Sequence, residues 1–422
     1  MPVSAYLYPW DVDGDPAAAD RIAGLGVTEV SLAAAYHAVR AVTPFHPAQR
    51  IVTQDAAVYY RPDPAQWRGA ALRPVDPGDG AAGSFERAAD ALHAAGLRVN
   101  AWVVVAHNGR LGAAHPECAV RNAYGDVYPW ALCIGSPEVA GYAATLSAEI
   151  AALGCVDAVE LEACGWYGYD HGSAHDKTGG VPPGGVPGWL LDACFCPACR
   201  AALRDTGLDP EDLARTVRAA LDAGYQSHVG PAQNGPAQDG PAGEAAQDGR
   251  PGDRTPTAGH LTVLADLAGS FAAVRAATAG SFLRQVLAAV RDAAPGHDVF
   301  LHSHPDPPET GSNPGYDPAV LLGPGGADGM ILACPGSPDA SAALVARTAQ
   351  GAGATQGARG APAGRRIAAT FPAVTALGAD TSQLTAKAVA VLAAGATDLR
   401  LYHAGLASAA DHTAMREVAK AT

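Results

Sequence analysis

Two glutamates stand two residues apart in the short apolar run Val156–Ala163. In an extended strand alternate side chains point to the same side, so Glu160 and Glu162 share one face while apolar residues occupy the other. Two carboxylates about 6 to 7 Å apart cannot both be ionised in a closed interior unless cations or hydrogen bonds compensate them. We therefore consider both as catalytic carboxyl candidates, with Glu162, nearer the end of the strand, as the better general acid/base. Glu160 could instead belong to a buried network with an inward-facing residue such as Arg400.

Further reactive and aromatic side chains follow the ends of other apolar runs. Aromatic rings can stack on the C–H faces of sugars, while carboxylate, amide and imidazole groups bind their hydroxyls. The sequence therefore predicts a carbohydrate pocket, with Asp11 or Asp170 as the second catalytic carboxyl group. The predicted substrate-binding residues are Tyr8, Trp10, His37, His107, Asn108, Trp166, Tyr167, His302, His304, Tyr402 and His403.

Three closely spaced cysteines, Cys194, Cys196 and Cys199, raise the question of a metal site. A closed structural zinc site needs four ligands, so a fourth would have to come from another part of the chain. The candidates for this fourth ligand are Cys118, Cys164, His171 and His175. The alternative is that the small thiols pack a loop against the core. No other cofactor is expected.

The histidines allow a different class of chemistry. His302 and His304 lie at positions i and i+2, on one face of a strand. Together with His37, His107, His403 and Asp11 they could form a catalytic metal site. The same residues therefore also allow an alternative function, that of a metal-dependent hydrolase or isomerase.

The elements that must position these residues are short apolar runs alternating with Ala-rich amphipathic stretches. This βαβα order is typical of a parallel sheet, and eight strands are the number that closes a (β/α)8 barrel. The connections that follow the strands are long, for instance 38–84 and 106–135, which places the site at the carboxyl ends of the strands. The predicted strands are Ser4–Trp10, Thr28–Ala34, Leu97–Ala106, Val156–Ala163, Asp298–Ser303, Gly329–Cys334, Ile367–Phe371 and Asp398–His403.

One segment does not fit the barrel pattern. Residues 226–258 form a repetitive Gly/Pro/Ala/Gln/Asp tract with almost no side chain to bury, which predicts a disordered insertion. The barrel would then consist of residues 1–225, with strands one to four, and residues 259–422, with strands five to eight. A second tract of this kind, Gln350–Gly364, is expected to form a loop before the seventh strand.

The charge and hydrophobicity of the chain exclude some classes of binding partner. The chain of 422 residues carries a formal charge of −14 and no run of Lys or Arg, which argues against nucleic acid and anionic membranes as partners. No stretch of 18 uninterrupted apolar residues and no signal-peptide pattern is present, so we expect a soluble cytoplasmic protein. The eight cysteines are too sparse for a disulfide scaffold. The expected partner is a small molecule or an oligosaccharide, and the sequence leaves the oligomeric state open.

Three stretches of the chain together resemble a known family. They are His115–Asp126, Leu132–Val139 and Val156–Glu162, followed by the Cys-x-Cys-x-x-Cys motif at 194–199. This pattern is similar to that of the glycoside-hydrolase-like (β/α)8 barrels of bacteria, and the similarity covers roughly residues 100 to 205. The resemblance implies a barrel that acts on glycosyl bonds. It places Glu162 at the acidic position that closes the fourth strand, where many retaining glycosidases carry their acid/base.

The seventh strand departs from this pattern. Glycosidases of this kind usually carry their nucleophile at its end, but here the strand leads into Thr370-Phe371-Pro372-Ala373, which has no carboxylate. A second acid would have to come from Asp11, Asp170, Asp306 or Glu309. The gap also supports a third possibility, a catalytically silent barrel that binds carbohydrate.

Overall fold

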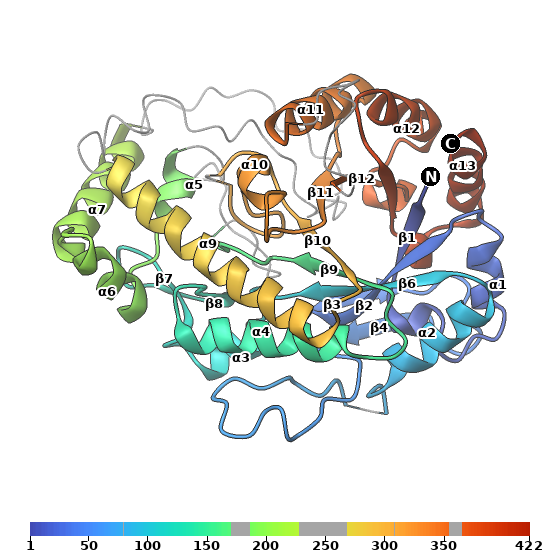
Figure 1. The fold of residues 1–422 in the computed structure, drawn as a ribbon, viewed down its shortest axis with the longest axis horizontal. Helices are drawn as coiled ribbons and strands as arrows, with labels where there is room; N and C mark the ends of the chain where they lie inside the picture. The colour runs from blue at the N-terminus through green and yellow to red at the C-terminus, as the bar shows by residue number, and fades with distance from the viewer. Residues whose placement is uncertain (79, 170–185, 228–267, 308, 354–364) are drawn as a thin grey trace.

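Eight parallel strands close into a barrel at the centre of the molecule (Figure 1). The computed structural model describes residues 1–78, 80–169, 186–227, 268–307, 309–353 and 365–422. Strand β1 pairs in parallel with both β2 and β13, and this double pairing closes the ring. In the order of the chain the barrel strands are β1 (Val3–Leu7), β2 (Glu29–Tyr36), β6 (Arg98–Val104), β9 (Ala158–Glu162), β10 (Asp298–His302), β11 (Gly329–Ala333), β12 (Arg366–Pro372) and β13 (Asp398–Tyr402). The predicted (β/α)8 barrel is confirmed, and each predicted strand overlaps an observed one.

The largest difference from the predicted boundaries is at the first strand. The predicted strand Ser4–Trp10 ends already at Leu7, because Pro9–Asp11 forms a short 3₁₀ helix, η1. The Asp11 carboxylate accepts a hydrogen bond of 2.8 Å from the backbone N–H of Tyr8, which holds this turn. The aromatic and acidic residues after β1 are therefore presented by a turn at the barrel mouth rather than by the strand.

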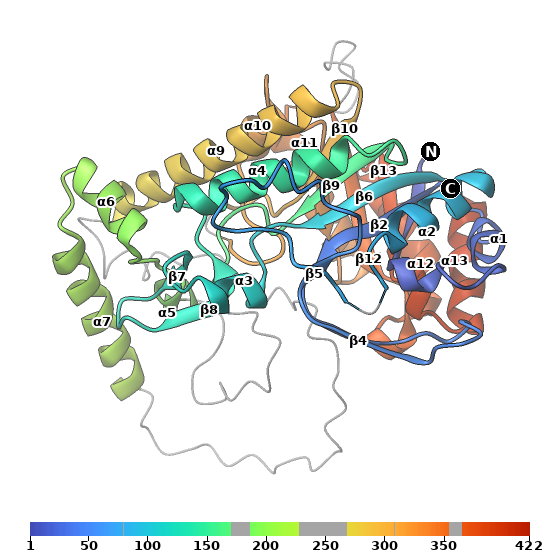
Figure 2. The ribbon, with the colours of Figure 1, turned by 90° about the horizontal axis from the view of Figure 1, so that it is seen from below.

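Helices cover the outside of the barrel. Pro occupies the first position of α4 and α11, where its missing N–H costs nothing. In both views α4 and α9 lie side by side, and α12 and α13 pack together near the two chain termini (Figures 1 and 2). None of the described helices is both long and apolar enough to cross a bilayer. The helices around the barrel are α1 (Ala18–Ala23), α2 (Ser84–Ala94), α3 (Gly109–Ala114), α4 (Pro137–Ala151), α9 (Ala268–Ala293), α10 (Pro318–Leu321), α11 (Pro338–Gly351), α12 (Leu384–Ala393) and α13 (Ala409–Ala421).

The long connections after β2 and β6 contain small strands that the sequence analysis did not predict. Strands β3 (Val39–Val42) and β4 (Ile51–Gln54) form one antiparallel pair, and β5 (Ala57–Val58) pairs with the end of β2. Strands β7 (Ala119–Arg121) and β8 (Val127–Leu132) form a second hairpin. Short 3₁₀ turns η2 (Thr375–Leu377), η3 (Thr381–Gln383) and η4 (Ala404–Leu406) follow β12 and β13. These connections build the rim of the barrel mouth.

Three further helices form a lobe beside the barrel, which the sequence analysis did not predict. We call α5 (Val186–Leu191), α6 (Pro197–Asp205) and α7 (Pro210–Ser227) the helical lobe. The lobe has a hydrophobic core of its own, to which the beginning of α9 contributes Phe271. At 1.5 Å per residue the 26-residue α9 is about 39 Å long, so it reaches from this lobe to the barrel, where it packs on α4 (Figure 1).

Several sequence predictions fall outside the described residues. Residues 228–258 of the predicted insertion 226–258 lie outside the described residues. Most of the tract Gln350–Gly364 also lies outside them. The same is true of Asp170, His171 and His175. These predictions stay untested.

Candidate functional site

A network of buried charges fills the lower part of the barrel interior. Arg400 on β13 is fully buried, and its Nε lies 3.0 Å from a carboxylate oxygen of Glu160. Its Nη1 lies 3.7 Å from Glu29 and 3.7 Å from Asp398. One guanidinium thus compensates three buried carboxylates, which is what allows charge in a closed interior. The ion pair between Glu160 and Arg400, one of the two roles that the sequence predicted for Glu160, is present.

Asn100 on β6 adds hydrogen bonds to the same network. Its side-chain nitrogen donates to Glu29 at 3.0 Å and to Glu160 at 3.1 Å. Arg366 binds Asp398 from the other side and also lies 3.1 Å from Asp298. With these partners Glu160 links β9 to β6 and β13 through buried polar contacts.

Glu162 lies two residues further along β9, towards the barrel mouth. Its side chain is partly exposed, and one carboxylate oxygen accepts a hydrogen bond of 2.6 Å from the indole Nε1 of Trp102. The ring of Trp102 is buried at the centre of an aromatic cluster. Ring centroids lie 4.7 Å away for Tyr36, 4.9 Å for Tyr6 and 6.2 Å for Tyr402. The structure thus presents one carboxylate at the mouth against a wall of aromatic rings.

Tyr8, after β1, is the second centre of this cluster. Its ring stacks on Trp10 at 4.5 Å and on His403 at 4.3 Å, and meets Tyr36 edge-on at 5.0 Å. Tyr8 also lies 6.0 Å from Trp102. Residues in or just after the C-terminal parts of β1, β2, β6 and β13 are therefore in contact around one mouth.

A line of stacked rings extends this wall towards β9. His37 stacks on Tyr36 at 4.2 Å and lies 4.4 Å from His107, which in turn stacks on Tyr167 at 4.6 Å. His107 Nδ1 is 2.9 Å from the Trp130 carbonyl, which fixes the orientation of its ring. Seven predicted pocket residues are thus brought together. They are Tyr8, Trp10, His37, His107, Tyr167, Tyr402 and His403.

His302 lies deeper in the barrel, between the mouth and the charge network. Its Nε2 is 3.2 Å from the Tyr6 hydroxyl and 3.9 Å from Glu160. Burial, reinforced by the charge of Arg400, lowers the pKa of His302 to about 3. Burial, followed by the charge of Glu160, raises the pKa of Tyr6 well above its usual value. Both groups are therefore neutral at pH 7 and can exchange a hydrogen bond without a net charge.

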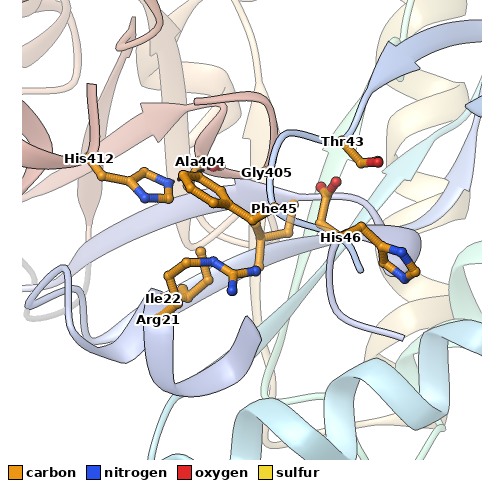
Figure 3. Close-up of a pocket in the computed structure, with 10 residues that line it drawn as sticks. Arg21, Ile22, Thr43, Phe45, His46, Ala404, Gly405 and His412 are labelled. Atoms are coloured by element: carbon orange, nitrogen blue, oxygen red, sulfur yellow. Dashed lines mark hydrogen bonds between the residues drawn. The ribbon is translucent and has the colours of Figure 1, made fainter. Parts of the chain in front are cut away.

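Asp11 is buried beside the loop after β13. Its Oδ2 lies 3.9 Å from His403 Nδ1, and a Cβ at Gly405 would collide with this carboxylate, so only glycine fits there. Asp11 lines a small pocket between the β1 turn and α1, and Figure 3 shows Arg21, His46 and His412 around the same pocket. Burial raises the pKa of Asp11 to about 7. At neutral pH this carboxyl group is therefore partly protonated.

Three predicted pocket residues have other surroundings. Asn108 caps α3, where its side chain accepts a hydrogen bond of 3.0 Å from the Leu111 N–H. His304 lies 3.4 Å from Asp306 in the loop after β10. The prediction for Trp166 needs correction, because its indole N–H donates to the Arg275 carbonyl and its ring packs under the Arg275 guanidinium. Trp166 thus faces α9, away from the aromatic wall.

The alternative metal site on His302 and His304 is not formed within the part of the chain that the structure describes. A metal site needs at least three His, Cys, Asp or Glu ligand atoms close together. Among the described residues, only one set of cysteines has its ligand atoms within 4.8 Å of one another. His302 contacts Tyr6, whereas His304 contacts Asp306. The paired spacing in sequence therefore does not converge with Asp11.

In this set of cysteines the fourth residue differs from the predicted candidates for the fourth ligand. Cys194, Cys196 and Cys199 come together with Cys133, which was not among the predicted fourth ligands. The Cys133 Sγ lies 3.4 Å from Cys199, 3.5 Å from Cys196 and 3.6 Å from Cys194. Cys118 and Cys164 lie outside this set.

Sequence reasoning missed several important residues of the interior. Trp102 and Asn100 lie inside the predicted strand Leu97–Ala106, and their even spacing puts them on the inward face together. This alternation could have identified both. Tyr6 follows from the same rule on the first strand. For Cys133, 61 residues before Cys194, the sequence offers no comparable spacing rule.

Comparison with known proteins supports the fold. No protein-family model and no curated protein matches the chain. Among solved structures, the PgaB (BpsB) glycoside hydrolase domain from Bordetella bronchiseptica has a TM-score of 0.58 and 15% identity, over 99% of this chain and 98% of that domain. The β-galactosidase from Halorubrum lacusprofundi has a TM-score of 0.54 and 12% identity, over 100% of this chain and 58% of that one.

A third similar structure is α-L-fucosidase isoenzyme 2 from Paenibacillus thiaminolyticus, with a TM-score of 0.52 and 12% identity, over 100% of this chain and 49% of that one. The chain thus spans about half the length of the galactosidase and the fucosidase, but nearly all of the PgaB domain. At these identities the likeness shows the fold. The chain has the (β/α)8 barrel seen in these glycoside hydrolase domains, which confirms the predicted resemblance at the level of the fold.

Proposed function

We propose that the chain hydrolyses a glycosidic bond at the mouth of its barrel, with Glu162 as general acid/base. The observation that carries this proposal is the position of Glu162 at the end of β9, bound by the Trp102 indole and facing an aromatic wall. A carboxyl group that changes its protonation state beside stacked rings suits a sugar whose apolar face packs on them. The glycoside hydrolase domains that share this fold are the analogy on which the reaction class is proposed, while the site residues supply the argument for it.

Buried polar atoms around the mouth support a ligand rich in hydroxyl groups. In the described part of the chain, Trp10 Nε1, Asp11 Oδ1 and both ring nitrogens of His403 have no hydrogen-bond partner. Buried polar atoms normally find a partner, so an unsatisfied group near a cleft calls for water or a ligand. Sugar hydroxyls donate and accept hydrogen bonds and would satisfy both kinds of atom.

In this proposal Glu162 protonates the oxygen of the leaving sugar while a second carboxyl group acts at the anomeric carbon. For retention, the second group attacks this carbon as the C–O bond breaks, and Glu162 then activates the water that hydrolyses the glycosyl-enzyme. For inversion, the second group activates the attacking water directly. The partly exposed Tyr402 packs on the sugar ring, supported from behind by the buried rings of Tyr8 and Trp102, while neutral His403 exchanges hydrogen bonds with the sugar hydroxyls. The second carboxyl group is Asp11 or Asp170, as the sequence predicts. A separation of about 5 to 5.5 Å between the two carboxyl groups would give retention of configuration, and about 6.5 to 9.5 Å would give inversion.

Release of the aryl group from a panel of aryl glycosides tests the proposal. The wild-type chain should hydrolyse at least one member, and Glu162→Gln should lower kcat by about 10² to 10⁴-fold. Glu417→Gln serves as the matched control, because Glu417 lies exposed on α13 and pairs with Lys420. Hydrolysis that Glu162→Gln leaves unchanged would end the assignment of this residue.

A catalytically silent carbohydrate-binding barrel is the second candidate, and one observation favours it. Strand β12, the seventh of the barrel, ends at Pro372 without a carboxylate in the position where glycosidases of the resembled family carry a nucleophile. Calorimetric titration of the wild-type chain with oligosaccharides distinguishes the two functions. Binding without turnover, lost in Trp102→Ala, would establish the silent barrel.

We place this activity in the cytoplasm. All eight cysteines lie in the described part of the chain and none of them forms a disulfide bond there, which suits a reducing compartment. The substrate would then be a small glycoside or an oligosaccharide present inside the cell. Fractionation of cells that produce the chain, followed by immunodetection, tests this location.

A further inference from the structure

We propose that Cys133, Cys194, Cys196 and Cys199 bind one structural zinc ion. All four residues are buried, and their sulfur atoms lie within 4.8 Å of one another. With Zn–S bonds of about 2.3 Å, a tetrahedral ion separates its sulfurs by about 3.8 Å. The three distances from Cys133 Sγ, 3.4, 3.5 and 3.6 Å, are close to this edge length. They are also far too long for a disulfide bond.

Backbone N–H groups surround the sulfurs as they do in sites built for thiolates. The N–H groups of Arg121 and Cys196 point at the Cys194 Sγ, both at 3.5 Å, and the N–H of Cys199 points at the Cys196 Sγ at 3.5 Å. Cys196 is the N-cap of the nine-residue helix α6, so its sulfur also sits at the positive end of the helix dipole. These donors stabilise negative sulfur and fix the direction of each ligand.

A buried cation beside the cluster would offset part of the charge of a zinc tetrathiolate. Four thiolates on Zn²⁺ carry a net charge of −2, which is costly in a buried place without a counter-charge. The Arg275 side chain from α9 is buried and lines the same small cavity as Cys194 and Cys199. Its Nη1 donates to the Asp192 carbonyl, two residues before Cys194, which holds the guanidinium in place. The buried Asp192 carboxylate interacts with this guanidinium, and thiolates at Cys194 and Cys199 would add further negative charge beside it.

Zinc binding to the four cysteines exchanges protons for a metal ion and involves no oxidation or reduction. Each thiol gives its proton to solvent, four Zn–S bonds form, and no atom changes its oxidation state. The four sulfurs leave no open position on a tetrahedral ion, so the ion would be structural and would not take part in hydrolysis. This inference is therefore independent of the proposed glycosidase activity.

The ion would connect two parts of the fold. Cys133 lies between β8 and α4, on the barrel, whereas the other three cysteines lie at the start of α6 in the helical lobe. The structure further places the Cys199 sulfur against Gly135, where a Cβ would come within 3.2 Å. One zinc ion thus ties the lobe to the barrel at the base of the β7–β8 hairpin.

Metal analysis of the purified full chain tests the inference. After expression with added zinc, plasma mass spectrometry should find about one zinc per chain, and Cys133→Ser and Cys199→Ser should each lose most of it. Cys334→Ser, which changes a buried thiol outside the cluster, should keep it. Less than about 0.1 zinc per chain in the wild type, or iron in its place, would overturn the proposal.

A second measurement covers variants that fail to fold. A mercurial reagent added to the wild-type chain should release zinc, detected by a chromogenic chelator, and Co²⁺ exchanged into the site should give the absorption of a tetrahedral tetrathiolate. A Co²⁺ spectrum typical of oxygen or nitrogen ligands would contradict the assignment of these four sulfurs. So would a soluble, folded Cys133→Ser chain that keeps its full content of zinc.

Discussion

Glu160 and Glu162 are the same residue type, two positions apart on the same face of β9, yet they lie in very different surroundings. Glu160 is fully buried, and its partners are the Arg400 guanidinium and the Asn100 amide. Glu162 is partly exposed, and one of its partners is the Trp102 indole. One step of the strand repeat, about 6 to 7 Å, thus separates a structural ion pair from a candidate acid/base.

This contrast shows what assigns a role to a carboxylate inside a barrel. The Arg400 guanidinium at hydrogen-bond distance pairs with Glu160 and thereby links β9 to β13. Near the mouth, the partly exposed side chain of Glu162 has access to solvent, with which a carboxyl group can exchange a proton. The following predictions test this contrast, from the largest expected change in stability to the smallest.

Replacing Arg400 should have the largest effect. Arg400→Met leaves Glu29, Glu160 and Asp398 without their shared cation, so the free energy of unfolding should fall by about 3 to 5 kcal/mol. Urea unfolding followed by circular dichroism measures this loss. Arg98→Met is the matched control, because Arg98 is largely exposed and lies 3.8 Å from Glu29, so it should cost less than about 1 kcal/mol. Equal losses for both variants would refute the special role of the buried cation.

Replacing each glutamate by glutamine compares the two positions directly. Glu160→Gln breaks the pair with Arg400 and should cost about 3 kcal/mol, whereas Glu162→Gln should cost about 1 kcal/mol or less. Hydrolysis should respond in the opposite sense, with the greater loss for Glu162→Gln. The same urea experiment and the aryl glycoside assay provide both readouts. If Glu162→Gln were the more destabilising of the two, the division of roles would be wrong.

Acid should destabilise the fold through two buried histidines. Burial lowers the pKa of His302 and of His403 to about 3, below the value of about 6.5 in the unfolded chain. Between these two values the unfolded state binds more protons, so the stability present above pH 6.5 is lost as the pH falls towards 3. Each histidine should account for about 2 kcal/mol at pH 5 relative to pH 7. Unfolding free energies of wild type and His403→Phe against pH measure this contribution.

Asp11 acts in the opposite direction. Its folded pKa of about 7 is raised above the unfolded value, so its contribution is full below pH 4 and is lost as the pH rises through 7. In Asp11→Asn the free energy of unfolding should therefore fall more steeply as the pH is lowered. Near pH 7 it should change less with pH than in the wild type. A pH profile identical to that of the wild type would show that Asp11 does not titrate in this range.

The last change in this series is the loss of one indole hydrogen bond. Trp102→Phe keeps an aromatic ring but removes the N–H that binds Glu162, and should cost about 1 to 2 kcal/mol. The matched control is Trp67→Phe, because the Trp67 indole donates to Glu149 at 2.8 Å outside the barrel mouth. Both variants should lose similar stability, but only Trp102→Phe should slow hydrolysis. A comparable slowing in Trp67→Phe would indicate a general effect of packing.

The barrel could be predicted from the sequence because its signals are local. Each strand is a short apolar run, and inward and outward residues alternate along it, as Glu160 and Glu162 do. The same alternation made Arg400 a reasonable partner for Glu160. The small hairpins of the long loops were missed, because strands of two to six residues with exposed positions carry little apolar pattern.

The site was less predictable because it depends on contacts between distant segments. Position at a strand end suggested that Trp166 faces the mouth, yet its ring packs with Arg275, 109 residues later. In the same way, Cys133 joins its partners only after the hairpin and α6 have folded against each other. Type and spacing identify residues that can do chemistry, but the direction of a loop side chain follows from the tertiary fold.

Helix α9 has a consequence for how the molecule melts. Its first turns complete the core of the helical lobe, and its remaining turns cover the barrel beside α4. Because helix formation is cooperative, loss of packing at one end of α9 weakens the helix towards its other end. We therefore expect the helical lobe and the barrel to unfold in one transition. Differential scanning calorimetry should therefore record one heat-absorption peak for the lobe and the barrel together.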